Sequence, residues 1–85
     1  MNRKKTIHSE QYSLLIEELI SERKRLNLSQ TEVGEQLGMT QSEISKIETI
    51  ERRLDIYEFK QFLNAYRVGE NERLRPIVLK FLDLE

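Results

Sequence analysis

Residues 30–49 read QTEVGEQLGMTQSEISKIET, and a helix-start motif stands at the head of each half of this stretch. Ser29 is followed three residues later by Glu32, and Thr40 is followed three residues later by Glu43. In such a capping box the hydroxyl accepts from the third helical N–H, and the carboxylate accepts from the N–H of the capping residue. The spacing therefore predicts that one helix begins at Ser29 and a second at Thr40.

The connection between these two helices is predicted to be tight. Because the second start follows so soon, the first helix must end by about Leu37, and Gly38 supplies the positive φ that a tight exit needs. Two short helices over 30–37 and 41–48 joined in this way have a helix-turn-helix geometry. Gly34 costs the first helix about 1 kcal/mol relative to alanine, and we expect its missing side chain to let the second helix cross closely.

Two longer helices are predicted on either side of this pair. From Ser9 to Arg25 the apolar residues recur at helical spacing: Tyr12, Leu15, Ile16, Leu19 and Ile20. Asp55 and Glu58 form a third capping box, which predicts a helix over 55–67. The apolar stripe that this helix is expected to bury consists of Ile56, Phe59, Phe62, Leu63 and Tyr66.

The segment after Gly69 again shows a helical period, in Leu74, Ile77, Val78, Phe81 and Leu82. A short strand over 77–82 is the alternative, since the run has β-branched residues and lacks a clear cap. The fold class predicted is all-α, a compact bundle of about five helices. Residues 1–8 are expected to be a flexible basic arm. Residues 69–85 are a C-terminal extension that either packs as the fifth helix or serves as a dimerisation element.

Composition excludes several classes of protein. Eighty-five residues allow one small core only, and 34% charged residues exceed the usual quarter. The absence of cysteine excludes disulfides and thiolate metal sites. No apolar run is long enough to span a bilayer. His8 is the one histidine, and no catalytic set or metal-ligand spacing is found, so neither an enzyme nor a metal or other cofactor is expected.

The second helix of the central pair carries the candidate functional face. At 100° per residue, Ile44 and Ile47 fall together toward the core. The opposite arc holds five hydrogen-bonding residues: Gln41, Ser42, Ser45, Lys46 and Thr49. Gln pairs with adenine, Lys favours guanine acceptors and Ser pairs with either, so Gln41, Ser42, Ser45 and Lys46 are predicted to read DNA bases. The alternative is an ordinary solvated polar face.

The stretch 30–49 resembles the helix-turn-helix of the XRE/Cro family of phage and bacterial repressors. Its apolar positions (Val33, Leu37, Met39, Ile44 and Ile47), Gly34 and the turn residue Gly38 all match, and the likeness extends over roughly 12–68. Residues 9–68 are accordingly expected to form the DNA-binding domain. Ile50 departs from the pattern, since many members have glycine there, and the net charge of −1 departs from the more basic members.

The resemblance implies roles for further residues. It implies that Gln30 props Gln41, and that Arg23 and Glu48 form a partly buried ion pair between the first helix and the reading helix. Contacts to DNA phosphates are expected from Gln30, Thr40, Thr49, Arg52 and Arg53. For Arg52 and Arg53, an exposed surface pair is the alternative.

The function predicted is a sequence-specific, double-stranded DNA-binding transcriptional regulator, with repression favoured, acting as a cytoplasmic homodimer on a palindromic operator. One short helix reads only a few base pairs, so two copies about 34 Å apart are needed. The alternative is an antitoxin-like or anti-repressor module that binds a basic protein partner. Its acidic surface would comprise Glu32, Glu35, Glu51 and Glu58.

Overall fold

The structure of the chain is a computed structural model that describes residues 9–83. Its helices are α2 (Glu10–Arg25), α3 (Gln30–Leu37), α4 (Gln41–Glu48), α5 (Ile56–Ala65) and α6 (Leu74–Leu82). Residues 9–83 contain no strand, so the all-α prediction is confirmed. The strand alternative for 77–82 is wrong, because this stretch lies within α6. The predicted arm over 1–8 lies outside the described residues.

All three predicted capping boxes form, and they begin α3, α4 and α5. Ser29 Oγ accepts from the backbone N–H of Glu32 at 3.0 Å, and the Glu32 carboxylate accepts from the backbone N–H of Ser29 at 2.7 Å. The other two boxes pair Thr40 with Glu43 and Asp55 with Glu58 in the same way. Local hydrogen bonding thus sets three helix starts, independently of tertiary packing.

The turn between α3 and α4 depends on two glycines. Gly38 has φ +71°, as predicted for a tight exit. A Cβ built on Gly34 would lie 2.4 Å from the backbone oxygen of Met39. The close approach predicted at Gly34 is therefore made by the backbone of the turn, and not by the body of α4. After α4 the chain turns at Ile50, which has φ +63°, a conformation that glycine adopts more readily.

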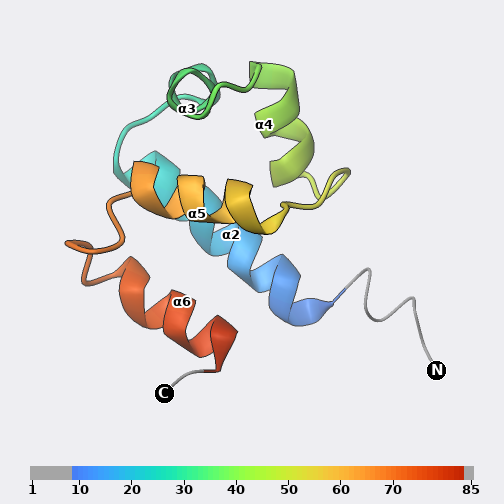
Figure 1. Cartoon of the computed structure of the whole chain (residues 1–85). Coiled ribbons are helices and arrows are strands. Elements are labelled where there is room, and N and C mark those ends of the chain that lie inside the picture. Colours follow the sequence, from blue (N-terminus) through green and yellow to red (C-terminus); the bar gives the residue numbers. More distant parts are fainter. Residues whose placement is uncertain (1–8, 84–85) are drawn as a thin grey trace.

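The helix pair α3–α4 lies at one end of the molecule and α6 at the other, with α2 and α5 between them (Figure 1). α3 packs against α4 and α5, while α2 contacts both α4 and α6. α2 is the longest helix, and its contacts with both α4 and α6 make it the scaffold on which α4 is held.

One hydrophobic core joins all five described helices. Its buried members are Tyr12, Leu15, Ile16, Leu19, Val33, Ile44, Ile47, Phe62, Tyr66, Leu74 and Val78. Ile56 was predicted to be buried but is 83% exposed. It stands in the first turn of α5, where it lines an open hollow with Phe59 and Phe81 that leaves its side chain uncovered. α5 ends at Ala65 rather than at 67, since Arg67 has φ +57°.

α6 packs on its own chain, with Leu74 and Val78 in the core. Its missing N-cap is supplied from further back: Asn71 Oδ1 accepts from the backbone N–H groups of Arg73 at 3.1 Å and Leu74 at 3.0 Å. Asn71 Nδ2 donates to buried Glu22 of α2 at 2.6 Å. The extension is thus tied to α2 by both apolar and polar contacts.

Candidate functional site

α4 presents the predicted polar arc on the surface of the molecule. Gln41, Ser42, Lys46 and Thr49 are exposed, and Ser45 is half-buried. The opposite side of the helix is fixed by Ile44 and Ile47, which are almost fully buried. α4 is therefore anchored by two isoleucines and offers hydrogen-bonding side chains outward.

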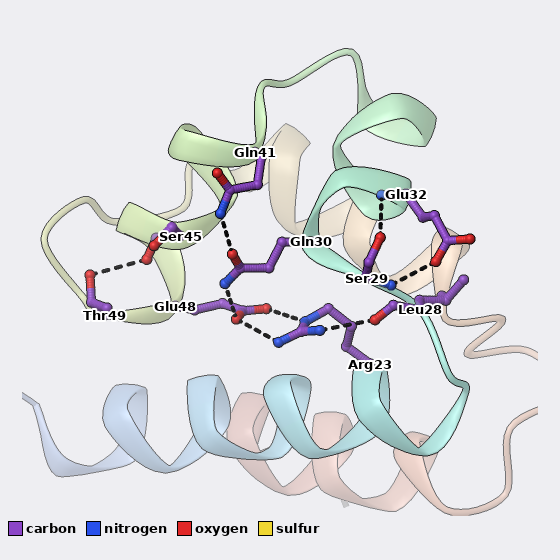
Figure 2. Close-up of polar contacts among 9 residues, drawn as sticks. All are labelled: Arg23, Leu28, Ser29, Gln30, Glu32, Gln41, Ser45, Glu48 and Thr49. Atoms are coloured by element: carbon purple, nitrogen blue, oxygen red, sulfur yellow. Dashed lines mark hydrogen bonds and ion pairs between the residues drawn. The ribbon is translucent and has the colours of Figure 1, made fainter.

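A continuous chain of hydrogen bonds runs from α2 to this surface (Figure 2). Glu48 accepts from Arg23 on one side and, through Oε1, from Gln30 Nε2 at 2.9 Å on the other. Gln30 Oε1 in turn accepts from Gln41 Nε2 at 2.6 Å. The structure thus brings together Arg23, Glu48, Gln30 and Gln41, four of the predicted site residues, from three helices.

The inner end of this chain is a two-point ion pair. Arg23 donates from Nε to Glu48 Oε2 at 2.7 Å and from Nη2 to Oε1 at 3.0 Å. A third bond runs from Arg23 Nη1 to the backbone oxygen of Leu28 at 2.9 Å. The two side chains are 11% and 9% exposed. Hydrogen bonding to Glu48 raises the pKa of Arg23 above its usual value, despite the opposing effect of burial.

The candidate phosphate-contacting residues fall into two groups. Thr40 is exposed at the first turn of α4, and Gln30 is half-buried at the first turn of α3, so both lie where backbone N–H groups are available to an anion. The hydroxyl of Thr49 is already engaged within the protein: it lies 3.1 Å from the backbone oxygen of Ser45 in α4 and 2.9 Å from Glu51 Oε2, and its one proton is shared between these acceptors.

The two arginines after α4 are placed differently from one another. Arg52 donates from Nη1 and Nη2 to the two carboxylate oxygens of Glu58, at 3.0 and 2.6 Å. This pairing lowers the pKa of Glu58 below its usual value. Arg53 is exposed, and its guanidinium carbon lies 4.7 Å from the centre of the Tyr12 ring. The charge of Arg52 is thus balanced within the fold, while Arg53 stacks on an aromatic face.

A second polar cluster was missed by sequence reasoning. Glu22 is buried beneath α6, accepts from Arg25 Nε at 3.0 Å and from Asn71, and lies 3.6 Å from Arg73 Nε. The hydrogen bond from Arg25 lowers the pKa of Glu22. Asn71 ahead of a helical period could have suggested a cap, but no local pattern links it to Glu22. This cluster supports the start of α6, and its bonds join α2 to the segment ahead of α6.

Tyr66 carries a buried hydroxyl for which no partner is found among the described residues. Burial raises its pKa well above the usual value. Residues 9–83 contain no group of three histidine, cysteine, aspartate or glutamate side chains arranged to hold a metal ion. Within the same part of the chain, no helix is long and apolar enough to cross a bilayer.

Comparison with known proteins gave one match. A family model described as helix-turn-helix matches residues 19–72, which include α3, the turn, α4 and α5. Searches among curated proteins and among solved structures found no match.

Proposed function

The chain belongs to the helix-turn-helix family of the XRE or lambda-repressor-like type, a family of DNA-binding transcription regulators rather than enzymes, and we propose that it acts as a repressor reading the major groove with α4 as a homodimer. One observation carries the proposal above all. The exposed face of α4 bears hydrogen-bonding side chains, and its first residue, Gln41, is held by Gln30. Preordered donors and acceptors on a short helix suit the edges of base pairs.

In the proposed complex, some side chains contact bases, others contact phosphates, and two hold α4 in place. Gln41, Ser42, Ser45 and Lys46 contact base edges, since they stand on the outward face of α4. Gln30, Thr40, Thr49 and Arg53 flank that face and contact phosphates, and Arg52 joins them once it leaves Glu58. Phosphate contacts set the register of α4 on the duplex, whereas base contacts specify the sequence. Arg23 and Glu48 have a structural part, because they fix α4 on α2.

The homodimer is proposed to form through the extension over 69–85, outside the DNA-binding domain over 9–68. Leu79 and Leu82 of α6 are 40% and 43% exposed, one turn apart, and stand on the side of α6 away from the core. Because Leu74 and Val78 are part of the core, removing the extension would damage the fold. Substitution of Leu79 and Leu82 by serine, followed by sedimentation, is the cleaner test. Unchanged dimerisation of that variant would exclude this face.

The proposal as a whole is tested by selecting binding sites from random duplexes, with the wild type and with Gln41→Ala. We expect a palindromic consensus from the wild type. For Gln41→Ala we expect lost preference at one base step in each half-site, with about 1–3 kcal/mol lost there. Gln36→Ala is a matched control, since Gln36 is exposed on α3. Failure of the wild type to bind any duplex at low salt would overturn the proposal. A regulator of this kind acts where the DNA is, so its proposed location is the cytoplasm.

A protein-binding module, antitoxin-like or anti-repressor, is the second candidate. Its support is the net charge of −1 together with the pairing of Arg52 by Glu58, which leaves less positive charge near α4. Salt dependence separates the two candidates. If several phosphates are contacted, the affinity for DNA falls steeply as the salt concentration rises. The plot of log affinity against log salt concentration steepens by roughly 0.9 for each phosphate contacted. A flat dependence would favour the protein partner.

A further inference from the structure

We propose that Glu48 is a positioning residue that sets the hydrogen-bond polarity of Gln41, and so makes the base step read by Gln41 specific for adenine over guanine. This inference rests on the proposed function, since it concerns what α4 reads. It extends that function because Glu48 contacts no base. It acts through Gln30.

The direction of the hydrogen bonds in this chain is set by the carboxylate of Glu48, which cannot donate. An ionised carboxylate only accepts hydrogen bonds, so the part of Gln30 that faces Glu48 must be its NH₂ group. The contact is Gln30 Nε2 to Glu48 Oε1, at 2.9 Å. Glu48 itself cannot turn away easily, because both of its oxygens accept from Arg23 in a site that is about nine-tenths buried.

The orientation of Gln30 in turn fixes the orientation of the Gln41 amide. With its NH₂ group committed to Glu48, Gln30 presents Oε1 to its other neighbour, and Gln41 must donate to it. Gln41 Nε2 does so at 2.6 Å. Figure 2 shows the Gln41 oxygen on the side away from Gln30. Gln41 is therefore left with one acceptor, Oε1, and one remaining N–H.

The acceptor and the remaining N–H of Gln41 match the major-groove edge of adenine and not that of guanine. In the major groove adenine offers the N6 amino donor beside the N7 acceptor, whereas guanine offers two acceptors, O6 and N7. Gln41 Oε1 accepts from adenine N6, and its remaining N–H donates to N7. At guanine the same oxygen would face O6, and two acceptors would repel. Reversal of the chain would give Gln41 two outward N–H donors and suit guanine instead.

Two variants break the chain at different points. Glu48→Gln replaces the carboxylate by an isosteric amide that can donate to Gln30, so both polarities become available. Gln30→Met removes the link at a half-buried position and leaves the ion pair of Arg23 and Glu48 in place. Gln36→Met is the matched control, because it makes the same change on the exposed face of α3.

The base step that Gln41 contacts is first located as the step at which Gln41→Ala loses its preference. Affinity is then measured for two duplexes that carry adenine or guanine at that step and are otherwise identical, and the ratio of the two affinities is compared between variants. We expect the wild type and Gln36→Met to prefer adenine by about tenfold or more, and both Glu48→Gln and Gln30→Met to lose most of that preference. Circular dichroism checks that each variant is folded. If Glu48→Gln does not fold, Glu48→Asp takes its place, because the shorter carboxylate keeps the negative charge opposite Arg23 but draws back from Gln30 Nε2.

The failures are distinguishable. A wild type that binds its selected operator but shows no preference for adenine at that step overturns this inference and leaves the proposed function intact. So does an unchanged preference in Gln30→Met or in a folded Glu48→Gln. A wild type that binds no duplex overturns the proposed function, and this inference with it.

Discussion

Arg23, in the last turns of α2, holds both carboxylate oxygens of Glu48, the last residue of α4, with Nε to Oε2 at 2.7 Å and Nη2 to Oε1 at 3.0 Å. The pair joins the scaffold helix to the helix that carries the candidate reading face. A two-point contact restricts rotation of α4 about its own axis, in addition to the packing of Ile44 and Ile47. The direction in which the polar arc points is therefore set partly by α2.

Glu48→Ala should destabilise the fold strongly. Removal of the carboxylate leaves Arg23 charged, poorly solvated and with one protein acceptor, the backbone oxygen of Leu28. Loss of one partner of a buried pair typically costs about 3–5 kcal/mol. The measurement is the free energy of unfolding in urea. Glu35→Ala is the control, because Glu35 is exposed on α3 and should change stability by less than about 0.5 kcal/mol. Equal stability of Glu48→Ala and wild type would contradict burial of the pair.

Local patterns predicted much of this molecule. The three capping boxes were read correctly because each depends on residues three apart, whatever the rest of the chain does. The polar arc of α4 was likewise found from periodicity. Local patterns did not reveal contacts between distant residues: the pair of Arg23 and Glu48 and the contact of Gln30 with Gln41 were expected only from the family resemblance. The bond between Glu22 and Asn71 joins residues 49 apart, and nothing in either local sequence specifies the other. Glu58 was recognised as a capping residue, yet its second role, pairing Arg52 across the loop, needed the fold.

Ile56 shows a different limit. It has the right spacing to continue the buried stripe of α5 but is 83% exposed. Periodicity gives the face of a helix on which a residue lies, but it does not give the length over which neighbouring helices cover that face.

Gly34→Ala should destabilise the turn although alanine favours helices. The added Cβ would lie 2.4 Å from the Met39 backbone oxygen, so the turn itself would have to move. Overpacking of this kind costs about 1–3 kcal/mol, which outweighs or cancels the gain of about 1 kcal/mol in helix propensity. Thermal unfolding measures the difference.

Gly69→Ala is the matched control for that change. No atom lies within 4 Å of a Cβ built there, and Gly69 lacks a positive φ. Its substitution should leave the melting temperature unchanged or slightly raised, because alanine lowers the entropy of the unfolded chain. A Gly34→Ala variant as stable as Gly69→Ala would show that the turn is not closely packed.

Acid should weaken the fold through Glu22. The hydrogen bond from Arg25 holds the pKa of Glu22 below its usual value of 4.5. Since the folded pKa is lower than the unfolded one, the unfolded chain binds the proton more readily. The stabilisation is complete above about pH 4.5 and is lost as the pH falls through the folded pKa. Urea unfolding at a series of pH values should show this decline.

Glu22→Gln isolates that contribution. The amide has no proton to take up, so its free energy of unfolding should fall less steeply with acid than that of the wild type. It should also be lower at neutral pH, where the ionised carboxylate accepts from both Arg25 and Asn71. Glu58, whose pKa is lowered by Arg52, contributes a slope in the same direction that remains in this variant. Parallel pH profiles of variant and wild type would count against Glu22.

Glu58→Gln should strengthen binding to DNA through Arg52. In the fold, both carboxylate oxygens of Glu58 accept from Arg52, which competes with any phosphate for the same guanidinium. The amide of this variant would still cap α5 through its side-chain oxygen but would no longer neutralise Arg52. One more phosphate contact steepens the log–log salt dependence by about 0.9. Glu35→Gln is the control, since it changes net charge equally at an exposed position of α3 without touching Arg52 or a proposed phosphate-contacting residue. Salt titrations of duplex binding compare the two variants. Equal slopes would mean that Arg52 takes no phosphate when released, and that its part is confined to holding the loop against α5.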